Sequence, residues 1–336
     1  MNNKNIIPIF FASDKNYLPY LTVSVFSLAS FATSNHNYEI NILTDDLTES
    51  DISELKTLEK ENFKINIVDV THKIESIRQK VALRDYYSVS IYYRLFIPTL
   101  FPEHKKAIYL DSDIVLNRDI ADMFETDIKD NYLGAVLDEV IWSNPDFTFY
   151  ARNALGVTEK EYFNSGVLIM NLDKFREDDI ENDFYNYVNS YNFGTVAPDQ
   201  DYLNCKCHGK VTYLDKGWNK MPMGKKLADN ELFLIHYNMF MKPWKYKHTM
   251  FSDYFWKFAA QTSFYDTLKN KRETYPDNFK INDKKAYNNL VNMALDIAIS
   301  DNNYKKVVLG EKKTEEYGDY LVEETVNPVF TECPIC

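Results

Sequence analysis

Two carboxylates stand two residues apart inside an apolar run, and their spacing is the strongest chemical signal in this chain. The run extends from Ala107 to Leu116 and is interrupted by Asp111 and Asp113, which flank Ser112. An apolar run of this length is typical of a buried strand, and carboxylates at its end are costly to bury unless a cation compensates them. A divalent metal with oxygen ligands supplies that compensation. The pattern therefore suggests a cation site that can hold a diphosphate, although solvated acids at a strand end produce the same short motif.

The segments around this motif alternate between strand-like and helix-like patterns. Apolar runs or strict alternation predict strands at residues 6–12, 38–44, 64–70, 107–116, 133–138, 166–172, 211–214 and 231–235. Helical spacing predicts helices at residues 18–31, 48–61, 90–97, 251–268 and 283–299. Strands that alternate with helices predict an α/β fold whose sheet is mostly parallel and flanked by helices.

Polar residues follow several of the predicted strands at their carboxyl ends. Asp14, Asp111, Asp138 and His236 all fall at or just after such ends. Ligands of open α/β sheets bind at the carboxyl ends of the strands. We therefore expect these four side chains, which are far apart in the sequence, to meet at one site.

Composition excludes several classes of function. The 336 residues contain 38 Lys and Arg against 50 Asp and Glu, a net charge of −12, which argues against nonspecific nucleic-acid binding. The sequence has no run of about 20 apolar residues that would predict a transmembrane helix. Residues 1–8 are too weakly charged and too briefly apolar for a signal peptide. These features predict a cytoplasmic protein.

Four cysteines occur in two close pairs, Cys205 with Cys207 and Cys333 with Cys336. Zinc sites usually combine two pairs with two to four residues between the cysteines. The first pair is too tight for that pattern, and the second lies near the end of the chain. We expect free thiols in a reducing compartment.

Five segments occur together in a fixed order. They are FASDKNY at 11–17, YLDSD at 109–113, FNSGVL at 163–168, PDQDYLN at 198–204 and HYNMFMKPW at 236–244. In this order and spacing the chain resembles the family 8 retaining glycosyltransferases, which include glycogenin and bacterial lipopolysaccharide galactosyl- and glucosyltransferases. The resemblance implies a GT-A fold with a Rossmann-like sheet, a nucleotide-sugar donor and Mn²⁺, with Mg²⁺ as the alternative ion. We expect a catalytic domain over residues 1–250 and a helical extension with a poorly ordered tail over 251–336.

The resemblance also implies roles for individual residues. The metal would be held by Asp111, Asp113 and His236, and Lys242 would contact the donor diphosphate. The rest of the donor site would comprise Asp14 and Asn16 at the uridine together with Arg94, Ser112, Asp138 and Asn164. Ordinary structural roles compete with these assignments: Asp and Asn favour helix N-caps, Asn164 can serve a turn, and an arginine on a helix surface often forms a weak ion pair.

Three consecutive residues are the catalytic candidates, Asp199, Gln200 and Asp201. The resemblance places Asp199 and Gln200 beside the transferred sugar, with Gln200 near the far face of its anomeric carbon. Because glutamine is a poor nucleophile, Asp201 is the other candidate. The choice between front-face attack and a covalent intermediate stays open.

One position departs from the family pattern. Related sequences often carry glycine three residues after the histidine, where the backbone approaches the diphosphate, and this chain has Met239 there. Glycine adopts conformations that other residues avoid. We therefore expect an altered path for the loop that carries Lys242.

These observations predict transfer of glucose or galactose from a UDP-sugar to a glycan or glycolipid acceptor, in the synthesis of a cell-surface polysaccharide or lipopolysaccharide. A non-catalytic sugar-binding protein on the same fold and a metal-dependent phosphatase are the alternatives. Basic clusters at 269–272 and 284–285 are thin, so we expect at most weak peripheral contact with the inner face of a membrane.

Overall fold

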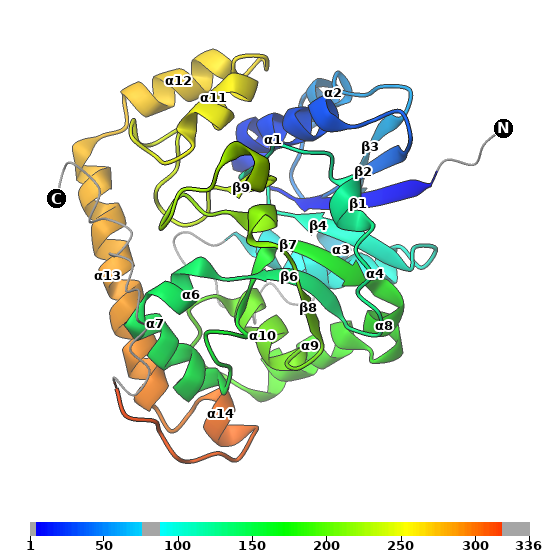
Figure 1. Cartoon of the computed structure of the whole chain (residues 1–336). Helices are drawn as coiled ribbons and strands as arrows, with labels where there is room; N and C mark the ends of the chain where they lie inside the picture. Colours follow the sequence, from blue (N-terminus) through cyan, green and yellow to red (C-terminus); the bar gives the residue numbers. More distant parts are fainter. Residues whose placement is uncertain (1–4, 76–87, 318–336) are drawn as a thin grey trace.

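A seven-stranded sheet with helices on both faces forms the centre of the protein (Figure 1). The computed structural model describes residues 5–75 and 88–317. The strands of the sheet, in the spatial order β3-β2-β1-β4-β7-β6-β8, are β3 (Phe63–Asp69), β2 (Asn37–Thr44), β1 (Ile6–Ala12), β4 (Lys106–Leu110), β7 (Phe163–Asn171), β6 (Leu133–Leu137) and β8 (Val211–Tyr213). A separate two-stranded sheet pairs β5 (Ile114–Leu116) with β9 (Leu234–His236).

The described residues also form a series of α-helices. They are α1 (Leu18–Phe31), α2 (Glu49–Lys56), α3 (Thr71–Glu75), α4 (Ile97–Leu100), α5 (Ala121–Phe124), α6 (Glu139–Ser143), α7 (Pro145–Tyr150), α8 (Leu172–Glu177), α9 (Ile180–Ser190), α10 (Pro198–Lys206), α11 (Ser252–Ala259), α12 (Tyr265–Glu273), α13 (Asp277–Ile299) and α14 (Tyr304–Val307). Within the described ranges, none of them combines the length and the apolar character needed to cross a membrane.

Alternating side chains of the strands supply two hydrophobic cores, one on each face of the sheet. Phe10 of β1 and Tyr109 of β4 pack into the first core, whereas their neighbours Phe11 and Leu110 pack into the second. Successive strand residues point to opposite faces, so helices must cover both faces to remove this apolar surface from water. The predicted α/β fold with a mostly parallel sheet is confirmed.

One strand runs against the others. β7 is antiparallel to both of its neighbours, β4 and β6, while the remaining pairs of the sheet are parallel. The beginning of β7 therefore lies at the edge where β4 and β6 end. β7 also begins at Phe163, three residues before the predicted strand, so Asn164 belongs to the strand itself.

Several predicted boundaries differ from the structure. The expected helix at 48–61 ends at Lys56 because the chain then turns to form a bridge between Lys60 and Phe63. The helix expected at 90–97 is a 3₁₀ helix, η2 (Val89–Phe96). The helix expected at 251–268 is divided into α11 and α12.

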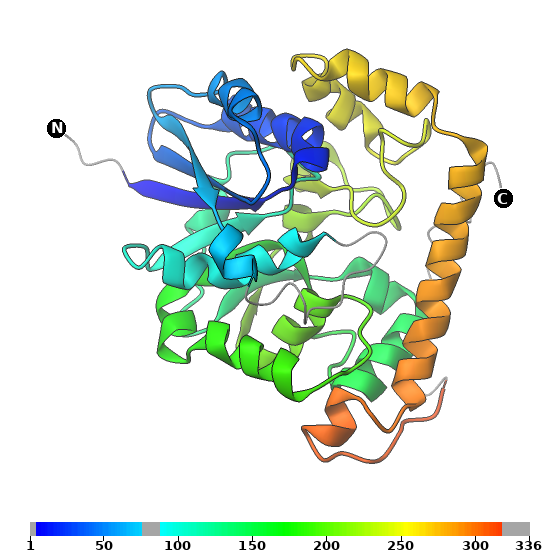
Figure 2. The same ribbon diagram turned by 180° about the vertical axis from the view of Figure 1, so that it is seen from behind.

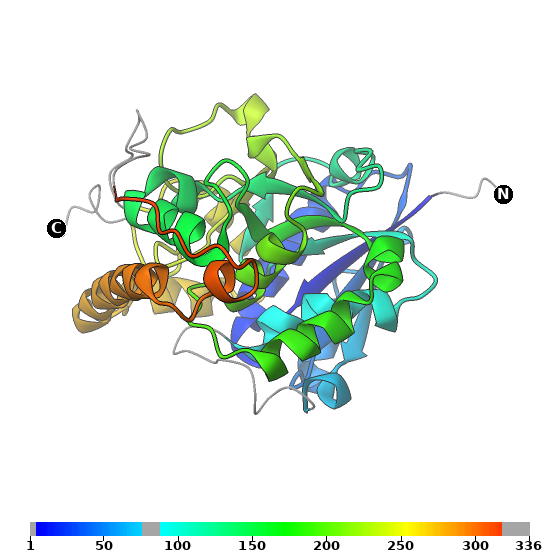
Figure 3. The same ribbon diagram turned by 90° about the horizontal axis from the view of Figure 1, so that it is seen from below.

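The C-terminal part of the chain runs along one side of the molecule. Figures 1 and 2 show α13 extending from the α11–α12 pair to α7, and the view from below places it at the edge of the molecule, apart from the sheet (Figure 3). Residues at the start of the expected tail make contacts, since Arg152 pairs with Glu315 at 3.3 Å. Residues 318–336, with Cys333 and Cys336, lie outside the described residues. Cys205 and Cys207 are free thiols.

Helix α1 holds the segment that carries the two aspartates. The hydroxyl of Ser24 lies 2.8 Å from the carbonyl oxygen of Ser112 and 2.7 Å from that of Ile114. The backbone N–H of Leu116 donates to the hydroxyl of Ser27 at 3.0 Å. Two buried serines thus satisfy backbone groups that the interruption between β4 and β5 leaves outside the main sheet.

Replacing Ser24 with alanine tests this support. We expect Ser24→Ala to lower the free energy of unfolding by about 1–3 kcal/mol, because buried carbonyl groups lose their donor. Ser30→Ala is the matched control: Ser30 lies on the same helix but is exposed and bonds only to Phe26, so its effect should stay within about 0.5 kcal/mol. Urea unfolding followed by circular dichroism measures both, and equal values would contradict the proposed support.

Candidate functional site

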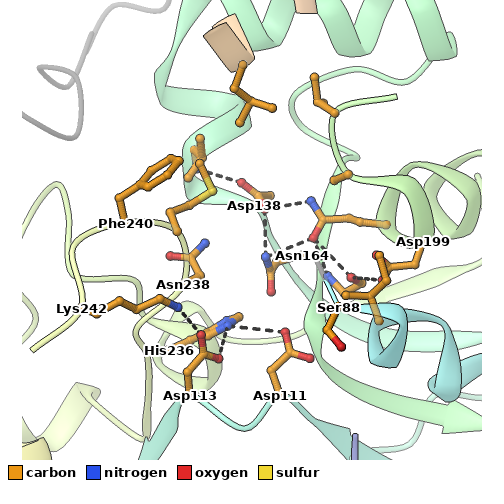
Figure 4. A pocket seen from close by; sticks show the side chains of 18 of the residues that line it. Ser88, Asp111, Asp113, Asp138, Asn164, Asp199, His236, Asn238, Phe240 and Lys242 are labelled. Carbon is orange, nitrogen blue, oxygen red and sulfur yellow. Dashed lines mark hydrogen bonds and ion pairs between the residues drawn. The ribbon is translucent and has the colours of Figure 1, made fainter. Parts of the chain in front are cut away.

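A cavity of about 780 Å³ lies where the polar residues of the sheet edge converge (Figure 4). Its walls combine the interruption between β4 and β5, the ends of β6 and β9, the beginning of β7, and residues of α10 and α13. The candidate residues in these walls are Arg94, Asp111, Ser112, Asp113, Asp138, Asn164, Asp199, Gln200, His236 and Lys242.

The two aspartates and the histidine meet because of strand pairing. Ile114 of β5 lies opposite His236 of β9, and the N–H of Tyr237 donates to the carbonyl of Asp113 at 2.9 Å. His236 Nε2 is 3.2 Å from Asp113 Oδ1 and 3.6 Å from Asp111 Oδ2. One ligand atom from each of the three residues lies within 4.8 Å of the others. Two carboxylates and one imidazole suit a divalent cation such as Mn²⁺.

A neighbouring amide orients the imidazole of His236. Asn219 Nδ2 donates to Asn164 Oδ1 at 2.9 Å, so its oxygen faces His236 Nδ1, also at 2.9 Å. This arrangement assigns the ring proton to Nδ1 and directs Nε2 toward Asp111 and Asp113. Such a hydrogen bond on the second ring nitrogen is common among histidines that bind metals.

Gly166 provides the space in which the three groups meet. A Cβ atom at this position would overlap with His236 Cε1 and lie 2.5 Å from Asp111 Oδ2. The backbones of Gly166 and Asp111 are also in direct contact, because the N–H of Asp111 donates to the carbonyl of Gly166 at 2.8 Å. The donor set and the space beside it both fit a bound cation.

Cationic side chains of this chain compensate the two aspartates. Arg94 Nη2 donates to Asp111 Oδ1 at 3.0 Å, and the ammonium group of Lys242 pairs with Asp113 Oδ2. Arg94, Lys242 and Asp113 are all buried. Burial alone would raise the pKa of Asp113, but the positive charge of Lys242 beside it outweighs burial and holds that pKa well below its usual range. Asp113 is therefore an anion at neutral pH.

A second cluster consists of hydrogen-bonding groups from three elements. Asn164 Nδ2 donates to Asp138 Oδ2 at 3.0 Å and to Gln200 Oε1 at 3.1 Å. Gln200 Nε2 in turn donates to Asp138 Oδ2 at 3.1 Å. Asp138 is also the N-cap of α6, with its Oδ1 accepting from the N–H groups of Val140 and Ile141. These short polar side chains form a preorganised wall that can bind hydroxyl groups.

The neighbours Asp199 and Asp201 occupy different environments. Asp199 lines the cavity and pairs with Arg94 at 3.3 Å. Asp201 accepts from the hydroxyls of Tyr150 at 2.7 Å and Tyr162 at 2.6 Å, and from the backbone N–H groups of residues 196 and 197. Burial raises the pKa of both carboxyl groups. The partners of Asp201 use both of its oxygens, so the structure gives it a supporting position.

Three further candidates are not part of the two clusters: Asp14 and Ser112 make local hydrogen bonds, and Asn16 is exposed. Asp14 Oδ1 caps the 3₁₀ helix at residues 15–17 by accepting from the N–H groups of Asn16 and Tyr17. Neither Asp14 nor Asn16 lines the cavity, although their neighbours Ser13 and Tyr17 do, so the expectation that Asp14 meets Asp111, Asp138 and His236 in one wall is wrong. Ser112 donates its hydroxyl proton to the carbonyl of Ala12 at 2.9 Å.

Met239 adopts the conformation that glycine favours. Its φ is 57°, in the left-handed region, and the residue lines the cavity. The methionine therefore does not move this residue out of the left-handed conformation, and the backbone bears the strain of a side chain there.

Two residues of this site were not singled out from the sequence, although Ser165 lies within the FNSGVL segment at 163–168. Asn219 orients His236 from a short 3₁₀ helix, and the hydroxyl of Ser165 joins Arg94 and Asp199, each at 3.0 Å. Both act through side-chain contacts between segments that are distant in sequence, so neither periodicity nor local spacing marks them.

Comparisons with known proteins identify the class. Residues 8–248 match the profile of Glycosyl transferase family 8, and the chain belongs to this family. It is 30% identical over 227 residues, 67% of each chain, to a Haemophilus influenzae protein provisionally named a glycosyltransferase. It is 24% identical over 261 residues to the lipopolysaccharide 1,2-glucosyltransferase of Escherichia coli, covering 73% of this chain and 74% of that one. The match covers only 49% of the Streptococcus pneumoniae glycosyltransferase GlyB.

Solved structures confirm the fold. A structure of the glycosyltransferase LgtC aligns with a TM-score of 0.64 and 24% identity, covering 76% of this chain and 96% of LgtC. The bifunctional glycosyltransferase WbbM aligns with a TM-score of 0.67 and 22% identity, covering 82% of this chain and 53% of WbbM. The protein is therefore a glycosyltransferase with the GT-A fold.

Gly166→Ala tests whether the space beside the aspartates is needed for a cation. We expect Mn²⁺ to raise the Tm of the wild-type protein by mass action, and Gly166→Ala to lose most of that increase because its methyl group enters the space between His236 and Asp111.

Gly134→Ala serves as the control for Gly166→Ala. Its Cβ would lie 2.9 Å from Ile128 in the core, so it should lower the Tm but keep the response to Mn²⁺. A wild-type response in Gly166→Ala would contradict the assignment. Differential scanning fluorimetry measures both variants.

Asp201→Ala tests the supporting role of that carboxylate. We expect a loss of at least about 2 kcal/mol in the free energy of unfolding, because several buried donors lose their acceptor together. Asp130→Ala, at an exposed aspartate, should change the same quantity by less than about 0.5 kcal/mol. Unfolding in urea compares them, and an unaltered stability of Asp201→Ala would show that these contacts contribute nothing.

Proposed function

We propose that this chain transfers glucose or galactose from a UDP-sugar to a hydroxyl of a glycan or glycolipid acceptor, with retention of anomeric configuration and with Mn²⁺, or alternatively Mg²⁺, as its metal. The observation that carries the proposal is the meeting of Asp111, Asp113 and His236 beside the polar wall of Asp138 and Asn164, in one cavity.

The names of relatives are consistent with these sugars. The E. coli relative is named a lipopolysaccharide 1,2-glucosyltransferase. LgtC is named a galactosyltransferase and has been crystallised with donor and acceptor sugar analogs. Another LgtC structure is that of an active-site mutant in which glutamate replaces glutamine. We extend the use of glucose or galactose, and an active-site glutamine, to this chain as a proposal. The proposed setting is the cytoplasm, in the synthesis of a cell-surface polysaccharide or lipopolysaccharide.

The proposal assigns the diphosphate to the charged end of the cavity. Asp111, Asp113 and His236 would hold a cation there, and its positive charge would stabilise the leaving diphosphate. Lys242, buried beside Asp113, adds a second positive charge at the same place, where charge develops as the glycosidic bond breaks. Arg94 holds Asp111 in orientation through its bond to Oδ1.

The sugar and the nucleoside take the remaining positions. Asp138 and Asn164 would bind hydroxyls of the transferred hexose, whereas a substrate that lacks those hydroxyls would leave buried polar groups unpaired. Gln200 and Asp199 lie in the same wall and are our candidates for the groups beside the anomeric carbon. Asp201 supports them, since it orders Tyr162, which accepts from Gln200 at 3.2 Å. Asp14 and Asn16 would hold the uridine at the rim.

A screen of donors tests the proposal. With Mn²⁺ present, we expect release of UDP from UDP-glucose or UDP-galactose, and little release of nucleotide from GDP- or CMP-sugars. Chelation with EDTA and the variant Asp113→Ala should each abolish it, because both remove the cation from the diphosphate. Asp130→Ala, on the surface, should retain wild-type turnover. Coupled detection of released nucleotide gives the rates.

Two results of this screen would contradict the proposal. Turnover that persists in EDTA would show that the reaction does not need a metal. If no UDP-hexose is turned over, UDP-hexoses are not the donors.

A further inference from the structure

Helix α13 forms one wall of the cavity, although it lies beyond residues 8–248, the part of the chain that matches the family. In Figure 4 the carboxylates of Asp111 and Asp113 lie at one end of the view and the pale orange ribbon of α13 at the other, with Asp138 and Asn164 between them. The polar wall assigned to the transferred sugar thus lies between the charged end and the part of α13 seen in this view, whereas nearer its start α13 pairs Asp283 with Lys245 at 3.4 Å.

The helix is fixed in this position from two sides. Asp283 accepts from the hydroxyls of Tyr246 at 3.0 Å and Tyr275 at 2.9 Å, which ties α13 to the segment after Lys242. On the other side, Asn144 Nδ2 donates to the hydroxyl of Tyr287 at 2.8 Å. Tyr287 also packs in a hydrophobic cluster with residues of α7 and of the loop after β9. The wall is therefore built on a rigid element.

The cavity side of α13 carries side chains that suit carbohydrate. Phe279, Asn282, Lys285 and Asn289 line the cavity and are exposed. Amide and ammonium groups can donate to sugar hydroxyls, and an aromatic face supplies apolar contact area. The exposed fraction of Phe279 is 49%, which is large for a phenylalanine on a fixed helix and leaves its ring available to a ligand.

The length of this surface indicates the size of the ligand. A helix rises 1.5 Å per residue, so the ten steps from Phe279 to Asn289 extend about 15 Å along the axis. That distance exceeds the width of one hexose ring. A single sugar bound at the reaction centre would leave most of the surface uncovered.

We propose that this face of α13, defined by Phe279, Asn282, Lys285 and Asn289, binds the acceptor, and that the acceptor is an oligosaccharide of at least two sugar rings. The ring that receives the hexose lies beside Asp138 and Asn164, and the next ring lies against α13, with Phe279 and Asn289 as specificity-determining residues. This inference rests on the proposed function, because it assigns the second substrate of the same cavity.

Sugar binding to matched variants tests the inference. Saturation-transfer NMR and the KM for UDP release would be measured with glucose and galactose, and with lactose, maltose and cellobiose. We expect at least one disaccharide to bind the wild-type protein about tenfold more tightly than its component monosaccharides. Phe279→Ala and Asn289→Ala should each lower the affinity for that disaccharide several-fold to about tenfold. Their weak affinity for monosaccharides should stay close to that of the wild-type protein.

The same helix offers matched controls. Ile281 and Asn288 are also exposed but lie outside the cavity wall, so Ile281→Ala and Asn288→Ala should keep wild-type affinity for the disaccharide. The Tm of every variant would be measured in parallel to exclude misfolding.

The outcomes separate this inference from the proposed function. If UDP is released but no disaccharide binds more tightly than a monosaccharide, or if Phe279→Ala and Asn289→Ala bind the disaccharide as the controls do, the inference is wrong and the proposed function stands. If no UDP-hexose is turned over, the proposed function is wrong.

Discussion

Compensation of the two neighbouring carboxylates, Asp111 and Asp113, is the constraint on which the rest of the structure depends. Each carboxylate has its own cationic partner, Arg94 or Lys242, and His236 lies between them. Removing one member of a buried ion pair leaves an uncompensated charge that typically costs about 3–5 kcal/mol. Because the partners come from η2 and from the segment after β9, the charged centre forms only when distant parts of the chain have packed together.

The reversed direction of β7 explains how so many polar groups reach one edge of the sheet. Parallel strands bring only their carboxyl ends to that edge, whereas β7 brings its first residues there. Asn164 consequently contacts Asp138, which follows β6, and Gln200 from α10, while Gly166 lies against Asp111. A single antiparallel strand therefore joins the charged centre to the polar wall of Asp138, Asn164 and Gln200.

Sequence patterns predicted the parts of the molecule that depend on local periodicity. The strand at 6–12 and the helix at 18–31 agree with β1 and α1 to the residue, because apolar runs and helical spacing are set by the two faces of the sheet. Motif order predicted that Asp111, Asp113 and His236 meet. The contacts of Asn219, the antiparallel direction of β7 and the position of α13 in the cavity wall could not be predicted, because they arise from tertiary packing alone.

The left-handed backbone at Met239 has a consequence for timing. A residue with a side chain pays on the order of 1–2 kcal/mol for this conformation, which glycine adopts freely. That energy is recovered whenever the segment between His236 and Lys242 rearranges to a more ordinary conformation. Compared with a glycine-containing counterpart, the segment that carries Lys242 therefore leaves its present conformation more readily, and under the proposed function this would shorten the time for which Lys242 holds the leaving diphosphate.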